Sequence, residues 1–295
     1  MTSHVMEDVP GRILRSAHRA KGVEMFFETG DGTRLAYEDH GQGRPIVFTA
    51  SWTLSGEMWE YQLPALVEHG YRCITVDRRG HGRSDRPSGG YDLDTGADDL
   101  AALLDHLDVR DAVLVGHSAG GAEISRYLAR HGEHRVAGAV FVSTVLPFLK
   151  ATADNPDGAP EAALHATLRA FRTDRPQWFA RQAQVWFATH LNDVSAATID
   201  HTVAQCLATS PWAGAALFES MFHQDHREDL RKISVPALVV HGTVDSSAPV
   251  ALTGRRTADL IPGATYKEYP TASHGLFMTH KEQLNADLLE FVGSC

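Results

Sequence analysis

Short apolar runs recur along the chain, separated by turns or by segments with helical spacing. Runs of four or five residues rich in Val, Ile and Phe are typical of strands buried in a parallel sheet. The segment 98–107 separates two such runs and places its leucines on one helical face. This alternation predicts an α/β fold with a mainly parallel central sheet flanked by helices. The predicted strands are 26–29, 34–37, 45–49, 73–76, 112–115, 139–142, 237–240 and 265–269, with a hairpin at Gly30–Gly32.

The alternation stops between residues 147 and 232, where the spacing is that of several helices. We expect 147–232 to be a helical lid inserted into a core formed by 23–146 and 233–295. Its large apolar side chains either line a substrate pocket or pack the interior of the lid, and the sequence leaves both open. Residues 1–22 are expected to be an N-terminal extension, to which the sequence assigns no role. The large apolar residues of the lid are Phe171, Trp178, Phe179, Trp186, Phe187, Trp212, Phe218, Met221 and Phe222.

The pentapeptide Gly116–Gly120 reads G-x-S-x-G and lies between the apolar run 112–115 and a helical pattern at 125–130. A sharp turn from strand to helix exposes a serine hydroxyl, and the flanking glycines let the backbone pass close to its neighbours. The start of the helix supplies backbone N–H groups that suit a developing oxyanion. Ser118 is therefore the candidate nucleophile.

A carboxylate that serves Ser118 is expected after a later strand, because sites built on this turn follow the chain order serine, acid, histidine. Asp245 follows the seventh predicted strand and so belongs to the edge of the sheet where Ser118 is expected. Asp225 and Asp229 compete for this role, but 228–232 has the composition of a solvated helix end. Asp245 is the candidate acid.

The base is sought among 17 histidines, of which His274 comes directly after the last predicted strand. Gly275 gives the backbone freedom at that point, whereas His280, the nearest rival, belongs to a helical pattern. In the predicted arrangement His274 takes the proton of Ser118. Asp245 fixes the tautomer of the imidazole and stabilises its cation.

Composition narrows the possible classes of function. The 295 residues include 27 Lys and Arg against 37 Asp and Glu, and the net charge of −10 gives no electrostatic reason to bind nucleic acid or an anionic membrane. Cys73, Cys206 and Cys295 lack the spacing of metal ligands, and Cys73 is expected to be a buried thiol. No apolar leader and no apolar stretch of ~18 residues is visible, so we expect a soluble, cytoplasmic protein.

Two charged segments have competing interpretations. Residues 77–85 are interpreted as a structural loop held by internal charge pairs, with a functional site as the alternative. The segment His223–His226 suggests metal ligands, but its spacing matches no common metal-binding pattern. No glycine-rich phosphate-binding loop is present. We therefore expect neither a metal nor a cofactor.

The number and order of these motifs resemble the α/β-hydrolase superfamily. Within it, the chain is similar to the cofactor-free bacterial haloperoxidase/arylesterase (perhydrolase) group. The resemblance extends from about Phe26 to Val292. Its segments are Trp52 near Trp59, Asp77–Gly80, Gly116–Gly121, His241–Gly242 with Asp245, His274–Gly275 and Lys281–Leu289.

The resemblance implies a role for each matching residue. Ser118 is the implied nucleophile, Asp245 the acid and His274 the base. The backbone N–H groups of Trp52 and Ala119 form the implied oxyanion hole. Candidate residues of the substrate pocket are Ser51, Val145, Trp186 and Ser247.

The chain departs from this group beside the implied oxyanion hole. Ala50–Ser51 stands where members of the group carry His-Gly, so the backbone is more restricted there and the Ser51 hydroxyl is a possible extra donor. Thr53 replaces the proline common in perhydrolases, which favours hydrolysis over peracid formation. Ser246 and Ser247 stand where relatives are more apolar, which predicts a wetter or roomier pocket.

The expected function is that of a serine hydrolase that cleaves a small-molecule ester or lactone through an acyl-enzyme on Ser118. A C–C bond hydrolase or a perhydrolase with the same three residues remains an alternative. A non-catalytic binding or accessory protein is a third interpretation, in which the altered loop has abolished turnover. A homo-oligomer is compatible with the resemblance, but the sequence reveals no interface.

Overall fold

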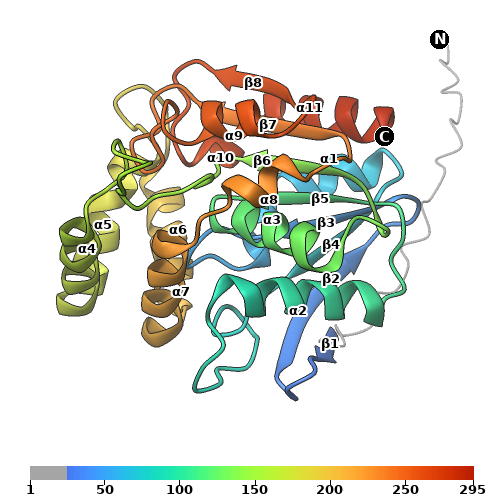
Figure 1. Cartoon of the computed structure of the whole chain (residues 1–295), viewed down its shortest axis with the longest axis horizontal. Helices are drawn as coiled ribbons and strands as arrows, with labels where there is room; N and C mark the ends of the chain where they lie inside the picture. The colour runs from blue at the N-terminus through green and yellow to red at the C-terminus, as the bar shows by residue number, and fades with distance from the viewer. Residues whose placement is uncertain (1–24) are drawn as a thin grey trace, which may run out of the picture.

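The central sheet has eight strands in a computed structural model that describes residues 25–295. The predicted extension 1–22 lies outside the described residues. The strand order is β1-β2-β4-β3-β5-β6-β7-β8, antiparallel from β1 to β4 and parallel from β4 to β8 (Figure 1). This arrangement confirms the predicted mainly parallel sheet. The strands are β1 Met25–Glu28, β2 Arg34–His40, β3 Pro45–Thr49, β4 Arg72–Val76, β5 Ala112–His117, β6 Val136–Val142, β7 Ala237–Gly242 and β8 Thr265–Tyr269.

Helices cover both faces of the sheet, and alternate side chains of each strand serve the two faces. In β3, Val47 packs in the apolar cluster that includes α2 and α3, whereas Ile46 and Phe48 pack in the cluster that includes α1 and α11. Two buried apolar layers, one on each face, therefore lie between the sheet and its helices. The helices of these layers are α1 Gln62–Glu68, α2 Leu93–His106, α3 Ala119–His131, α8 Arg227–Arg231, α9 Gly254–Leu260, α10 Leu276–Thr279 and α11 Lys281–Ser294.

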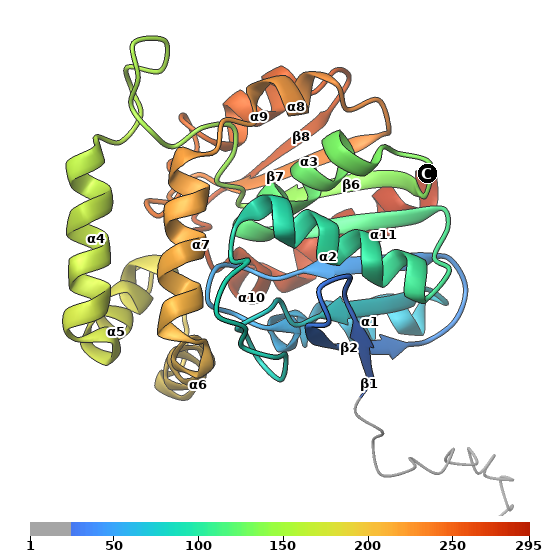
Figure 2. The ribbon, with the colours of Figure 1, turned by 60° about the horizontal axis from the view of Figure 1, so that its bottom comes forward.

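The stretch without alternation, 147–232, forms five helices, of which the first four lie together at one side of the sheet (Figure 2) and the fifth, α8, packs against α3. Asp174 accepts a hydrogen bond from the Gln177 N–H at 3.0 Å and thereby caps the second of them. Ser195 and Ser210 cap the third and fourth in the same way. The four helices are α4 Glu161–Thr173, α5 Arg175–Trp186, α6 Ala196–Ala208 and α7 Pro211–His223.

The charged loop 77–85 is tied to distant elements, so the prediction that internal charge pairs hold it is wrong in part. The buried Arg78 pairs with Glu123 of α3. Arg79 donates to both carboxylate oxygens of Asp99 on α2, at 2.6 and 2.7 Å. The Asp77–Arg83 contact alone among these is internal to the loop. The reason is burial, because a buried guanidinium needs a carboxylate beside it, and the sheet brings carboxylates of α2 and α3 to this loop.

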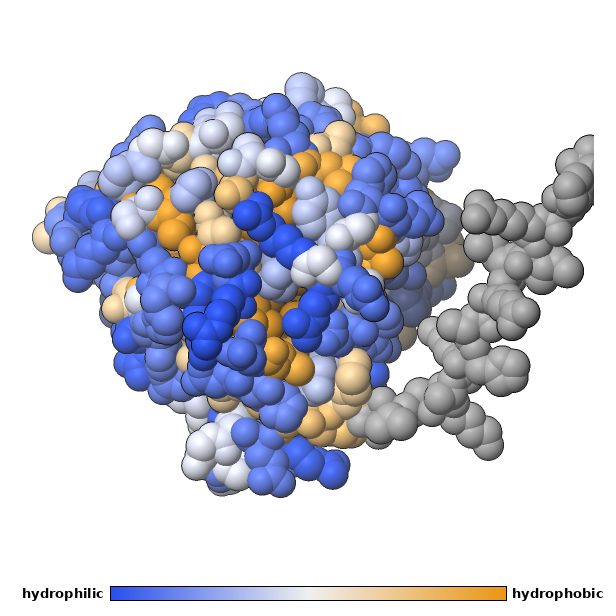
Figure 3. All heavy atoms as spheres, turned by 90° about the vertical axis from the view of Figure 1, so that its right-hand side faces the viewer, coloured by the Kyte–Doolittle hydropathy of each residue, from blue (hydrophilic) through white to orange (hydrophobic). Residues whose placement is uncertain are grey.

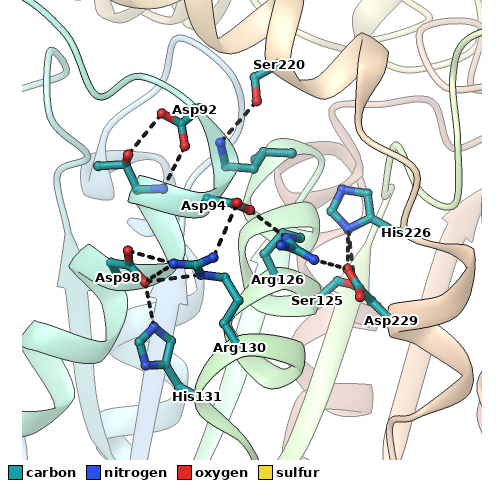
Figure 4. A network of polar contacts seen from close by, with 12 residues as sticks. Asp92, Asp94, Asp98, Ser125, Arg126, Arg130, His131, Ser220, His226 and Asp229 are labelled. Atoms are coloured by element: carbon teal, nitrogen blue, oxygen red, sulfur yellow. Dashed lines mark hydrogen bonds and ion pairs between the residues drawn. The ribbon is translucent and has the colours of Figure 1, made fainter.

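The prediction of a solvated helix end at 228–232 is correct for Glu228, Arg231 and Lys232, which are exposed, but wrong for the inward side of the helix. Leu230 is fully buried and Asp229 is 9% exposed, because α8 packs against α3. Arg126 of α3 donates to Asp229 at 2.7 Å and to Asp94 of α2 at 2.8 Å, so that one guanidinium joins three helices (Figure 4). Asp229 is thereby occupied in the packing of the core.

The surface turned toward the viewer in Figure 3 is largely hydrophilic, with apolar side chains visible between the polar ones. Within residues 25–295, no helix has both the length and the apolar character that crossing a membrane requires. Cys73 is a fully buried thiol, as predicted, and burial raises its pKa to about 12.

Candidate active site

Ser118 lies at the turn between β5 and α3, with φ 54° and ψ −112°. A positive φ is unusual for a residue with a side chain and indicates a backbone held by its surroundings. Gly116 and Gly120 allow this turn. A Cβ at Gly116 would lie 2.5 Å from the carbonyl carbon of Gly120, and a Cβ at Gly120 would lie 2.4 Å from the carbonyl oxygen of Thr49. The two glycines are therefore required by the close approach of β3, β5 and α3.

The structure brings Ser118, His274 and Asp245 together at the carboxyl ends of the strands. His274 Nε2 lies 2.9 Å from Ser118 Oγ, and its Nδ1 lies 2.7 Å from Asp245 Oδ2. All three side chains are buried, with at most 4% of each residue exposed. Of the rival acids, Asp225 pairs with Arg227, so neither it nor Asp229 takes part.

Asp245 is held by several donors besides His274. Its Oδ1 accepts from the N–H groups of Ser247 and Ala248 at 2.9 and 2.8 Å, and its Oδ2 lies 3.3 Å from His241 Nε2. Burial acts to raise the pKa of Asp245, but His274 and His241 together outweigh burial and hold that pKa well below its usual range. The carboxylate is therefore ionised at neutral pH.

Two buried histidines to which the sequence analysis assigned no role support this group. His241 Nε2 lies 2.8 Å from the carbonyl oxygen of Ala248, so the proton is on Nε2 and also faces Asp245. His117 Nε2 donates to the carbonyl oxygen of His274 at 2.7 Å, and burial lowers the pKa of His117 well below 6.5. Both residues stand inside motifs, next to Ser118 and four residues before Asp245, but only the fold shows what they contact.

The candidate oxyanion donors sit on separate elements that meet beside Ser118. Ala119 is the first residue of α3, so its N–H has no partner within the helix. Trp52 follows β3, and its backbone N–H donates to no carbonyl or side chain of the described residues. Arg78 supports this segment, because its guanidinium donates to the Ala50 and Ser51 carbonyls at 2.9 and 3.4 Å. Through Arg78, the loop 77–85 thus supports the backbone of Ala50 and Ser51, directly before Trp52.

A cavity of about 590 Å³ opens onto Ser118 and His274. The candidate pocket residues Ser51, Val145, Trp186 and Ser247 all line it, as does Ser246. Trp212 neither lines the cavity nor packs inside the predicted lid, because it is 68% exposed on α7. Phe171 and Phe187 are buried away from the cavity wall. Those that line the cavity are Trp178, Phe179, Trp186, Phe218, Met221 and Phe222.

The end of α5 is bonded to the loop that carries His274. The Gly275 N–H donates to the Trp186 carbonyl at 2.8 Å, and Ser273 Oγ donates to the Val185 carbonyl at 3.0 Å. The Trp186 ring lies 5.9 Å from the His274 ring, edge to face. The helical segment therefore helps to position the imidazole.

The segment His223–His226 does not bring its side chains together. His223 pairs with Glu161 of α4, whereas His226 is buried against Ser125 of α3. Within residues 25–295, no group of three His, Cys, Asp or Glu side chains is arranged to hold a metal ion.

Residues 44–281 match the model of the alpha/beta hydrolase fold family. A non-heme chloroperoxidase of Kitasatospora aureofaciens is 42% identical to this chain, over 90% of it and 98% of the relative. A bifunctional esterase/perhydrolase of Acinetobacter calcoaceticus is 35% identical, over 91% and 99%. The solved structure of an esterase from Exiguobacterium antarcticum gives a TM-score of 0.88 at 28% identity, over 92% and 99%. The chain therefore belongs to the α/β-hydrolase family, and within it these relatives are named as haloperoxidases, esterases and perhydrolases.

Proposed function

We propose that the protein is a serine hydrolase that cleaves a carboxylic ester or lactone through an acyl-enzyme on Ser118. The observation that carries this proposal is the chain of hydrogen bonds from Ser118 through His274 to an ionised Asp245, at 2.9 and 2.7 Å. This chain faces a cavity large enough for a small organic substrate. Serine needs such a neighbour, because its hydroxyl is a weak nucleophile on its own.

In the proposed reaction, Ser118 Oγ attacks the acyl carbon and His274 Nε2 takes the hydroxyl proton. Asp245 keeps the Nδ1–H tautomer in place and stabilises the imidazolium. The N–H groups of Trp52 and Ala119 bind the oxyanion, and one such donor contributes roughly 3–4 kcal/mol to the barrier. His274 then gives the proton to the departing alkoxide. Water, activated by His274, attacks the acyl-enzyme and releases the acid.

We also propose that the chain is divided into a core and a lid, with helices α4–α7 of the predicted segment 147–232 as the lid and α8, which packs against α3, as part of the core. In this division the aromatic residues of α5 and α7 that line the cavity bind the acyl chain. The hydrogen bonds from α5 to the Ser273–Gly275 loop support this proposal, because they hold the end of α5 next to the loop of His274.

A perhydrolase reaction is the second candidate, and the similarity to a bifunctional esterase/perhydrolase favours it. Hydrogen peroxide would take the place of water and release a peracid from the same acyl-enzyme. Thr53, in place of the proline common in perhydrolases, supports the hydrolytic reaction as the main one.

The test is hydrolysis of a series of p-nitrophenyl esters from acetate to octanoate by the wild type and by Ser118→Ala. We expect the substitution to lower kcat by a factor on the order of 10⁴ or more and to abolish labelling by a fluorophosphonate. Addition of hydrogen peroxide, with a peracid assay, separates the two candidate reactions. Binding of esters without turnover or labelling would instead support the accessory protein.

A further inference from the structure

One pair of opposite charges lies on the cavity wall outside the Ser118–His274 group. Arg256 Nη2 on α9 donates to Asp157 Oδ2 at 2.6 Å, and its Nη1 donates to Asn155 Oδ1 at 3.0 Å. All three residues line the cavity. Among the lining residues of the described chain, Arg256 is the one Lys or Arg, and Asp157 is the one Asp or Glu. The charge of the wall therefore depends on this pair.

The two partners of Arg256 are held very differently. Asn155 is 5% exposed, and its Nδ2 donates to the Lys150 and Phe148 carbonyls at 2.7 and 3.2 Å. Its Oδ1 is therefore fixed toward the guanidinium. The Asp157 side chain, in contrast, is 62% exposed, against 34% for Arg256. Asn155 and Arg256 form the fixed part of the arrangement, and Asp157 is a counter-ion that water also reaches.

A guanidinium oriented in this way matches the geometry of a carboxylate. Asp157 fills that position with its own carboxylate. A substrate whose acyl chain ends in a carboxylate would have to displace Asp157 and approach its negative charge. The chain as a whole is also negative, at −10.

We propose that Arg256 is a carboxylate subsite of the substrate pocket, masked by Asp157, so that the native enzyme selects uncharged acyl chains. The proposal rests on the proposed function, because it names the substrate class of that same pocket. Neutralising Asp157 uncovers the subsite and admits esters of dicarboxylic acids.

The experiment compares p-nitrophenyl hexanoate with the mono-p-nitrophenyl esters of glutarate, adipate and suberate, whose lengths sample the distance from Ser118. We expect Asp157→Asn to raise kcat/KM for at least one anionic ester by about fivefold or more relative to hexanoate. The gain should shrink with added salt. Adding Arg256→Gln should abolish it. Asp154→Asn is the matched control, because Asp154 lies in the same loop, is 70% exposed and pairs with Arg227.

A purely mechanical role for the pair gives a different result. If the contact only fastened the 150–159 loop to α9, Asp157→Asn and Arg256→Gln would change the rates with all esters in the same direction. An unchanged ratio of anionic to neutral ester would then overturn the subsite.

Product binding tests the subsite without turnover. In the Ser118→Ala background, calorimetric titration with glutarate, adipate, suberate and hexanoate should show tighter binding of a dicarboxylate after Asp157→Asn and no such gain with Arg256→Gln added. Failure to gain dicarboxylate affinity overturns the subsite even if no ester is cleaved. The same gain in affinity, together with no ester hydrolysis and no fluorophosphonate labelling in the proteins that retain Ser118, would overturn the proposed function and leave the subsite standing.

Discussion

At the scale of single residues, the carboxylate of Asp245 is surrounded by donors, and His241 is the least expected of them. Its Nε2 is shared between the Ala248 carbonyl at 2.8 Å and Asp245 Oδ2 at 3.3 Å. It is fully buried and helps to lower the pKa of Asp245. A buried histidine that does not contact Ser118 thus helps to hold the orientation and charge of the Asp245 carboxylate.

We expect His241→Phe to lower kcat by about tenfold with little change in KM, because Asp245 loses a donor while the cavity wall stays intact. His241→Gln retains an N–H donor and should recover part of the loss. Steady-state kinetics at neutral pH, with melting temperatures to show that both variants fold, provides the measurement. Equal losses in the two variants would mean that shape, and not the hydrogen bond, is what His241 supplies.

Gly120 is a second single residue on which the site depends, because the absence of a side chain there lets α3 approach β3. A Cβ there would meet the Thr49 carbonyl oxygen at 2.4 Å. We expect Gly120→Ala to lower the free energy of unfolding by about 2–3 kcal/mol and to displace Ser118. Urea unfolding and ester hydrolysis measure the two effects. The control is Gly89→Ala, because no atom lies within 4 Å of a Cβ at that exposed glycine. A stable, active Gly120→Ala variant would contradict this account of the turn.

At the scale of elements, sequence patterns predicted what is local and missed what is tertiary. The strands 45–49 and 265–269 match β3 and β8 to the residue, because apolar or β-prone runs bounded by turns determine them. The order of strand ends also placed Asp245 and His274 near Ser118. In contrast, α2 begins at Leu93, five residues before the predicted start, because the Asp92 side chain caps it by accepting from the Thr95 N–H at 2.8 Å.

The missed features share one physical cause, which is that their partners are remote in sequence. Glu123 accepts from Arg78 across 45 residues, and the burial of Asp229 depends on Arg126, 103 residues earlier. Composition shows that these residues are charged but not which element neutralises them. The same holds for His117, whose partner is the carbonyl of His274.

Helices α5 and α7 allow a matched pair of substitutions. Trp186 on α5 lines the cavity and lies against the ring of His274, whereas Trp212 on α7 is 68% exposed. We expect Trp186→Ala to lower kcat for short esters and to shift the chain-length optimum toward longer acyl chains, because the pocket gains the volume of an indole. Trp212→Ala should leave both unchanged. The p-nitrophenyl ester series measures this, and an unaltered optimum in Trp186→Ala would contradict the assigned wall.

At the scale of the whole molecule, buried neutral histidines make stability depend on pH. Burial, with Arg126 as the next cause, lowers the pKa of His226 to about 3, and burial together with Arg78 does the same for His81. In the unfolded chain these groups take up protons below about pH 6.5. The contribution of these two histidines to the free energy of unfolding is therefore complete above about pH 6.5. It is lost as the pH falls, because only the unfolded state binds the protons.

We expect the free energy of unfolding to fall by about 2–3 kcal/mol per buried histidine between pH 7 and pH 4.5, before most carboxylates titrate. Urea titrations at several pH values measure the slope. His226→Gln removes one titrating group and should make the slope shallower. A slope equal to that of the wild type would show that His226 does not remain neutral in the folded protein.

The bonds between the end of α5 and the Ser273–Gly275 loop have a consequence for how such enzymes diversify. A segment that lines the cavity and is also bonded to the loop of His274 cannot be exchanged as an independent module. A chimera that receives α4–α7 from a relative also receives new hydrogen-bond partners for its His274 loop, together with new contacts to the acyl chain. Recombination at this fold should therefore succeed when the crossover keeps the last turn of α5 and the His274 loop from one parent.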